Sequence, residues 1–393
     1  MSTQHPFVAT LTSLLNDPSA AGISISTDYR SPMPTIAPPA GTLRAGGTGG
    51  KPVEDVHGEF DLPDGRQAVV IDSVGSQASR MEAAAEDLAD QVGLPLVRFI
   101  DDQGELLTTS ARLSHRHADA IWRASIAELT AAGIPFDQIQ AATVDSAQPL
   151  LDWFPTALLM GWWHSQVLVT DPKKAKTTAK DRTDALHGDT QAAQTLAGYA
   201  QQGPQMRSAR VMTAEIIATG VARRRRMPAK VDSLLGPLAK TTAKGPSSLG
   251  LGSLPPVHES RAVIDVTYDD IRGSWWLSLA GLRQVNGLQE PETARVLLSC
   301  LALLLHDHAQ RATRLRSGTE LVTATRTVEV WRHGSAPEAL EVPDHDTLVE
   351  IVRTLGVQAG WHGPQDVTIP KGSVLDRIMH IAAAEADTAA ADA

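Results

Sequence analysis

The chain has one cysteine, Cys300, among its 393 residues, and its aromatic content is only 4%. A lone thiol excludes an internal disulfide framework and a thiolate pair for a metal, and it favours a reducing compartment. The longest apolar run, VLLSCLALLL at 296–305, has about half the length that a membrane span needs, and no charged and then apolar leader opens the chain. We therefore expect a soluble, cytoplasmic protein in which this run forms a buried helix.

The sequence also lacks the short motifs of familiar catalytic sites. It contains no GxxxxGK(S/T) phosphate loop, no GxSxG elbow and no HExxH pair. We therefore expect no enzymatic activity, no cofactor and no bound metal. A hydrolytic dyad assembled from residues distant in the chain stays open as an alternative.

Charge is distributed unevenly along the chain. The net charge of the whole chain is −10. Residues 173–244 hold 14 Lys/Arg against 5 Asp/Glu, a local charge of +9, and the rest of the chain holds 21 against 40, a charge of −19. A basic tract on an otherwise acidic protein can bind phosphate without making the whole molecule bind nucleic acid nonspecifically. A solubilising loop has the same composition. The candidates for binding phosphate in this tract are Lys173, Lys174, Arg223, Arg224, Arg225 and Arg226.

Hydrophobic spacing predicts an α+β protein. We expect helices over 7–16, 77–92, 114–133, 291–311, 345–355 and 373–386, and strands over 67–71, 94–100, 261–270 and 319–331, with 274–285 pairing with 261–270. Two strand–helix–strand units separated by a long excursion favour a ferredoxin-like or RRM-like palm, an antiparallel sheet with helices on one face and the other face free to bind. The palm is expected over 65–170 and 258–335, with a basic insertion at 171–257, a Gly/Pro-rich loop at 31–60 and a flexible tail at 387–393.

The stretch VVIDSVGSQASRMEAAAEDL (69–88) reads as a strand that turns into a helix. Ser73, Ser76 and Ser79 all offer N-caps, and Ser79 with Glu82 fits a capping box. N-capping and the capping box do not explain Gln77 and Arg80, which lie one helical turn before the apolar residues Met81 and Ala84. Polar side chains at the positive end of a helix favour a phosphate, so we interpret Ser76, Gln77 and Arg80 as anion-binding.

Two further polar clusters carry no complete catalytic or metal-binding set. SHRH (114–117) with Asp119 is too small for a metal site and suits a capped helix end or an RNA contact through His115 and Arg116. GWWHS (161–165) sets aromatic rings beside Ser165, which suits base stacking or two core tryptophans equally well.

Five segments together resemble one known family: IDSVGSQASRMEAA (71–84), HRHADAIWRAS (115–125), FPTALLMGWWHS (154–165), SLGLGSLPP (248–256) and ARVLLSCLALLLHDHAQRATRLRSGTELV (294–322). The family is the type I-U, or I-G, CRISPR-associated RAMP protein that forms the backbone of the Cascade surveillance complex. The resemblance runs over roughly 65–330. It departs where the family often has Asn in place of Ser79 and a Trp-Asp-Ser-Arg-Gly string in place of WHSQV.

The resemblance implies an RRM-like palm with inserted fingers and a thumb, and a filament of copies along a CRISPR guide RNA beside other Cascade subunits. Target DNA is then read by pairing with the guide, and the protein has no catalytic role. The matched positions are Ser76, Gln77, Arg80, His115, Arg116 and Ser165. Two alternatives stay open: a metal-dependent nuclease using His115, His117 and Asp119, and a scaffold whose basic tract binds an acidic partner.

Overall fold

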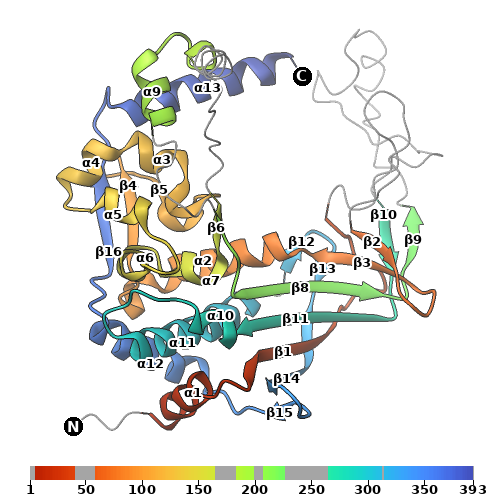
Figure 1. The fold of residues 1–393 in the computed structure, drawn as a ribbon. Helices are drawn as coiled ribbons and strands as arrows, with labels where there is room; N and C mark the ends of the chain where they lie inside the picture. Colours follow the sequence, from red (N-terminus) through yellow and green to blue (C-terminus); the bar gives the residue numbers. More distant parts are fainter. Residues whose placement is uncertain are drawn as a thin grey trace, which may run out of the picture.

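The computed structural model describes residues 5–39, 58–163, 183–198, 207–225, 264–311 and 314–392. Its centre is a seven-stranded antiparallel sheet with the order β15-β14-β1-β11-β8-β3-β2 (Figure 1). The strands are β1 (Ala20–Arg30), β2 (Glu59–Asp61), β3 (Gln67–Asp72), β8 (Met212–Thr219), β11 (Asp270–Ser278), β14 (Val322–Arg332) and β15 (Glu338–Ala339).

Four of these strands and two long helices form the RRM-like core. Helix α2 (Val74–Val92) lies in the chain between β1 and β8, and α11 (Pro291–Gln310) lies between β11 and β14. The four strands are adjacent in the order β14-β1-β11-β8. This is the β-α-β-β-α-β pattern of the ferredoxin-like and RRM-like folds, with β3 added beyond β8. The predicted fold class is confirmed.

The strand assignment behind that prediction needs two corrections. The core begins with β1, and β8 crosses the middle of the sheet, although both lie outside the ranges 65–170 and 258–335. The expected pairing of 261–270 with 274–285 is wrong, because β10 (Ile264–Thr267) pairs with β9 (Ala222–Arg225) while β11 pairs with β1 and β8. The stretch 171–257, expected as a basic insertion, therefore contributes one of the four core strands of the palm, β8, which lies between β11 and β3.

The second half of the first predicted unit leaves the main sheet. Strand β4 (Leu96–Ile100) pairs with β5 (Leu106–Thr109) and, in parallel, with β16 (Pro364–Thr368). The helix expected over 114–133 is broken into η2 (Arg116–Ala118), α3 (Ala120–Ala124) and α4 (Ile126–Ala131). Arg116 has a positive φ of 55°, Asp119 is extended with a ψ of 156°, and Ser125 leaves the helical region between α3 and α4. The remaining elements of this region are η1 (Ser110–Arg112), α5 (Phe136–Ala141), α6 (Gln148–Trp153), α7 (Pro155–Met160), and β6 (Trp162–Trp163), which pairs with β7 (Arg207–Ser208).

The other helices surround this framework. They are α1 (Pro6–Asn16), α9 (Thr190–Gly198), α10 (Leu279–Arg283), α12 (His345–Gln358) and α13 (Val374–Asp392), and the short strands β12 (Arg314–Arg316) and β13 (Thr319–Glu320) follow α11. Helix α13 continues into the residues expected as a tail. None of the helices in the part of the chain that the structure describes combines the length and hydrophobicity of a membrane span.

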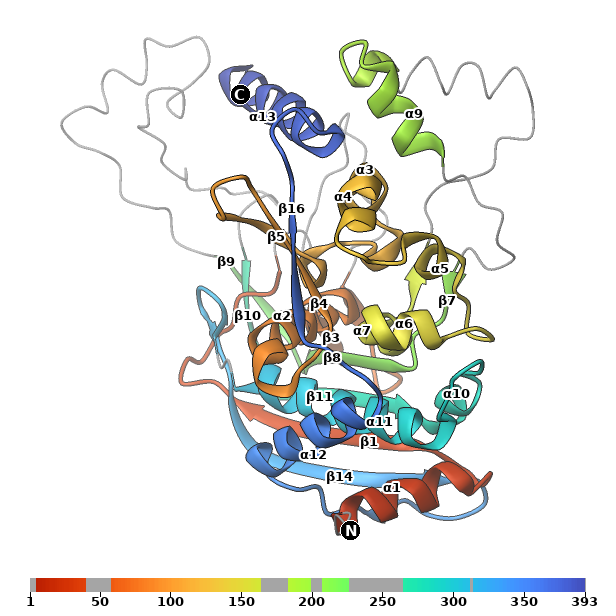
Figure 2. The same ribbon diagram turned by 90° about the vertical axis from the view of Figure 1, so that its left-hand side faces the viewer.

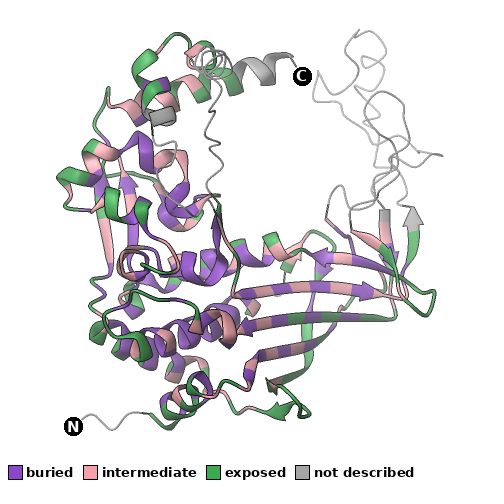
Figure 3. Cartoon of the chain, in the orientation of Figure 1, coloured by how far each residue is buried: buried purple, intermediate pink, exposed green. Residues whose placement is uncertain are grey.

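One face of the sheet packs on α2 and α11, and Figure 2 shows these helices with α12 in front of the strands. Ile23, Ile25 and Trp275 on the strands share one buried cluster with Met81 of α2 and the leucines of α11. The run at 296–305 is buried as expected. Figure 3 shows the interior between the sheet and its helices largely in purple. Burying each such leucine stabilises the fold by about 1.5–3 kcal/mol. A second, smaller cluster, which includes Tyr29, lies farther along the same sheet.

Candidate functional site

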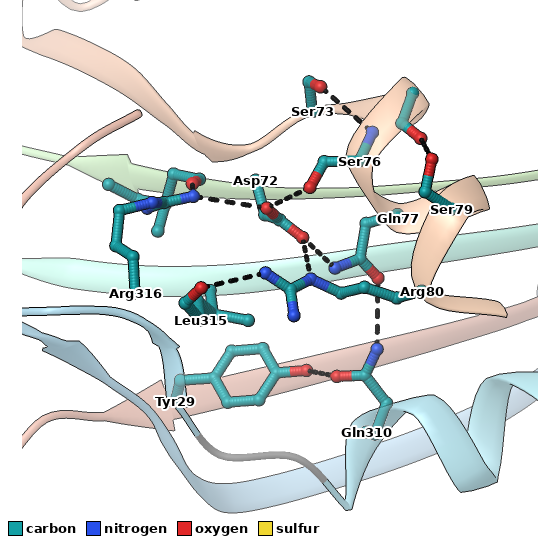
Figure 4. A network of polar contacts seen from close by, with 12 residues as sticks. Tyr29, Asp72, Ser73, Ser76, Gln77, Ser79, Arg80, Gln310, Leu315 and Arg316 are labelled. Carbon is teal, nitrogen blue, oxygen red and sulfur yellow. Dashed lines mark hydrogen bonds and ion pairs between the residues drawn. The ribbon is translucent and has the colours of Figure 1, made fainter. Parts of the chain in front are cut away.

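A buried carboxylate organises the junction between β3 and α2. Asp72, the last residue of β3, is fully buried. Its Oδ1 accepts a hydrogen bond from Ser76 Oγ at 2.7 Å, and its Oδ2 accepts from Gln77 Nε2 at 2.6 Å and Arg80 Nε at 2.8 Å (Figure 4). Arg316 of β12 reaches Oδ1 at 3.3 Å. The three α2 side chains converge because residues three and four apart share one helix face.

The same side chains tie five elements together. Arg316 also donates to the carbonyl of Ile71 at 2.7 Å, and Arg80 donates to the carbonyl of Leu315 at 3.1 Å. Gln77 accepts from Gln310 Nε2 at 3.1 Å, and Gln310 in turn accepts from the Tyr29 hydroxyl. The network therefore joins β1, β3, α2, α11 and β12, and it separates the two apolar clusters.

These contacts change the interpretation of the predicted anion site. Gln77 is 1% exposed and its amide is already bonded on both sides, so it lies out of reach of a ligand. The capping-box interpretation is wrong, because Ser73 caps α2 by accepting from the Ser76 N–H, and Ser79 Oγ bonds to the Gly75 carbonyl. The polar pattern that suggested a phosphate is largely satisfied by Asp72.

The surface above this network is nevertheless cationic. Two guanidinium groups share one carboxylate, which leaves one positive charge in excess, and the side chains of Arg80 and Arg316 remain 25% and 23% exposed. The exposed Arg210 adds another charge where its Nη1 donates to the Val74 carbonyl at 3.1 Å. The first N–H groups of α2 lie at the same place and precede the first intrahelical bond. We call Ser76, Arg80, Arg210 and Arg316 the α2 start cluster. Its chemistry suits an anion.

Arg116 of η2 connects its own segment to α2, because it pairs with Glu82 of that helix. Its Nε lies 2.7 Å from Glu82 Oε1, and its Nη1 donates to the carbonyl of Gly161 at 2.9 Å. Both side chains are buried, and burial raises the pKa of the Glu82 carboxyl although Arg116 acts in the opposite direction. The guanidinium has little surface left for RNA.

His115 and Trp163 form an aromatic edge close to this link. Their rings meet edge to face with centroids 6.2 Å apart, and Trp163 is 56% exposed. Its neighbour Trp162 is buried, so GWWHS contributes one core ring and one surface ring. An exposed indole can stack on a base.

The residues of the nuclease alternative do not converge. His117 is fully buried and packs between the rings of Phe154 and Trp162. Asp119 caps α3 by accepting from the Ile121 N–H. Over the described ranges, no group of three His, Cys, Asp or Glu side chains is placed to hold a metal ion.

The predicted basic residues have mixed positions. Arg223 pairs through its guanidinium with both carboxylate oxygens of Glu59. Arg224 and Arg225 lie in β9, where they pair in register with Asp265 and Ile264 of β10. Ser165, Lys173, Lys174 and Arg226 lie outside the described residues.

Two members of the α2 start cluster were not predicted from the sequence. Arg316 lies more than two hundred residues from Asp72 in the chain, and the segment 294–322 that contains it gave no reason to single it out. Arg210 was counted only as part of the basic tract. The helical spacing of residues 76–80 predicts which side chains of α2 lie on one face. It does not predict which arginines from other elements reach that face.

Comparison with known proteins gives one family. The model of the family described as CRISPR-associated protein GSU0053 matches residues 47–180, which include all of α2, Asp72, His115 and Trp163. No curated protein matches the chain. The match supports a CRISPR-associated protein and involvement in a CRISPR system.

Proposed function

We propose that this protein is a non-catalytic subunit that binds CRISPR guide RNA and oligomerises along it in a type I-U/I-G Cascade complex. Each copy would hold a segment of the guide, and the pairing of the guide with DNA would select the target. The partners are the guide RNA, target DNA through the guide, further copies of the chain and other Cascade subunits. The CRISPR-associated family match and the RRM-like fold, which many readers of single-stranded RNA share, support this function.

The observation that carries the proposal is the excess positive charge of the α2 start cluster. Arg80 and Arg316 together exceed the charge of Asp72, and Arg210 stands at the first turn of a 19-residue helix. A phosphate there would receive charge-assisted hydrogen bonds from guanidinium groups and from free backbone N–H groups. The exposed ring of Trp163 gives a stacking surface for an adjacent base.

Arg210 gives the cleanest test, because its side chain is exposed and, within the described part of the chain, its side-chain hydrogen bond goes to a backbone carbonyl. We expect Arg210→Ala to weaken binding of single-stranded RNA about 10- to 100-fold, since a bond to a charged group contributes about 1.5–3 kcal/mol. The salt dependence should lose about 0.7 of a unit of slope for the lost phosphate contact. Fluorescence anisotropy at several salt concentrations measures both quantities.

Arg353→Ala is the matched control. Arg353 is also exposed, and it pairs only with Glu350 on α12 among the residues that the structure describes. Equal affinities and salt slopes for the two variants would remove the α2 start cluster from the RNA-binding surface. Metal-dependent cleavage of RNA by the wild-type protein would favour the nuclease alternative instead.

A further inference from the structure

The side of the sheet that faces away from α2 and α11 has its own composition. Along β1, buried Ile23 and Ile25 alternate with partly exposed Ser24 and Ser26, and the same alternation runs through β8 and β11. The registers align one row of this side as Thr213, Trp276, Ser24 and Glu329, and the next row as Glu215, Ser274, Ser26 and Thr327. We call this side of β8, β11, β1 and β14 the helix-free face.

Two tryptophans are held in place on the helix-free face. The Trp331 indole is 44% exposed, and its N–H donates to Ser24 Oγ at 2.8 Å. The Trp276 ring lies across Gly22, where an added Cβ would come within 2.3 Å of the ring. Gly22 and Ser24 of β1 thus hold the Trp276 and Trp331 rings in fixed positions on this face. Fixed rings offer contact area at low entropic cost.

The charge of the helix-free face is negative. Arg272 pairs with Asp28 at 3.1 Å, which leaves Glu215 and Glu329 and a net charge of −2 over these four groups. Among the described residues, neither glutamate side chain has a hydrogen bond or an ion pair. Partial burial without a compensating charge raises the pKa of the Glu215 carboxyl. A half-buried carboxylate in this state gains most from a cation.

This composition decides between the two classes of macromolecule that bind such sheets. Aromatic rings on an RRM-like sheet would suit RNA bases, but two unpaired carboxylates among them repel the phosphates of the same strand. A lysine or arginine side chain is attracted by both glutamates and can also lie over an indole face. The charges therefore favour a cationic polypeptide.

We propose that the helix-free face is a docking surface for an extended polypeptide segment of another subunit that carries lysine or arginine residues. Glu215 and Glu329 lie three strands apart in adjacent rows, a separation of about 15 Å at the usual strand spacing. An extended chain covers that distance in about four or five residues. The segment therefore crosses the strands with two cationic residues at about this spacing. This surface is separate from the RNA contacts proposed above.

The test uses the full-length protein and a labelled peptide built on Ser and Thr with two arginines at that spacing. We expect Glu215→Gln with Glu329→Gln to weaken peptide binding about three- to tenfold, and Trp331→Ala about two- to fivefold, with RNA affinity unchanged. The same peptide with citrulline in place of arginine should bind no better to the wild type than to the double variant. Glu350→Gln, on exposed α12, is the control.

Three results would overturn the proposal: equal binding of the arginine and citrulline peptides, equal binding by the double variant and wild type, or a loss of RNA affinity in Trp331→Ala. Melting temperatures confirm that each variant is folded before it is compared. The RNA measurement runs in parallel, so failure of peptide docking is distinguishable from failure of the proposed RNA function.

Discussion

At the scale of the residue, Asp72 shows how a buried charge is made tolerable. Its two oxygens have four side-chain partners, two of them arginines. Two opposite charges offset much of the cost of taking one carboxylate out of water, and the hydroxyl and amide satisfy its remaining lone pairs. The same contacts fix the start of α2 against the sheet.

Arg80→Ala should therefore destabilise the protein. Removing this charged partner from Asp72 should lower the free energy of unfolding by about 1.5–3 kcal/mol, because the carboxylate keeps only Arg316, Ser76 and Gln77. Urea denaturation measures the change. Ser79→Ala, one residue earlier on the exposed side of α2, should stay within about 0.5 kcal/mol of wild type. Equal stabilities of the two variants would show that Arg80 has no structural role.

His306 sets a pH dependence in the core. It lies in α11 against the ring of Trp275, and burial followed by the charge of Arg326 lowers its pKa to about 3. Because the unfolded pKa is near 6.5, the unfolded state binds the proton first and stability falls as the pH decreases below about 6.5. The loss at pH 5 should reach about 2 kcal/mol.

The variant His306→Phe isolates this effect. It removes the titrating group and keeps a ring of similar size, so the difference in unfolding free energy between pH 7 and pH 5 should shrink by about 2 kcal/mol. An unchanged difference would mean that other groups set the acid sensitivity.

At the scale of the element, α2 has its polar start and its apolar stripe where the sequence places them. Met81, Ala84, Ala85, Leu88 and Val92 are buried at helical spacing as predicted. The spacing also brings Ser76, Gln77 and Arg80 to one face. It does not identify the anion they bind, because a buried carboxylate and an external phosphate require the same donors.

Other elements were hidden for equally physical reasons. Strand β1 alternates apolar and polar residues only around Ile23 and Ile25, and it also contains Ala, Gly and Asp, which are depleted in strands. Strand β8 alternates cleanly in burial, although it lies within the basic tract, whose charge is typical of a solvent-exposed insertion. Within the broken 114–133 segment, Arg116 contacts Glu82 and Gly161, which belong to parts of the chain distant in sequence. Tertiary contacts decide such boundaries.

The cap of α2 can be tested directly. Ser73 Oγ accepts from the Ser76 N–H at 3.3 Å, so Ser73→Ala should lower the free energy of unfolding by about 1 kcal/mol. Urea denaturation beside Ser79→Ala makes the comparison, since the capping-box alternative predicts the larger loss at Ser79. A larger loss in Ser79→Ala would restore that alternative.

At the scale of the whole molecule, the sheet separates three kinds of surface. One side holds the two core helices, and the start of α2 holds an excess of positive charge. The helix-free face carries tryptophans among glutamates whose side chains have no partner in the described ranges. Under the two proposals above, this separation would let an acidic protein bind RNA and a second polypeptide without competition between the two. It is consistent with a subunit that repeats along a guide.

The most direct test of the central proposal is the number of protein copies bound to single-stranded RNAs of increasing length, measured by mass photometry. A subunit that oligomerises along a guide should add copies in proportion to RNA length, and Arg210→Ala should shift that series to higher protein concentrations. A single copy on every RNA regardless of its length, or no RNA-bound species at all, would contradict the proposed function.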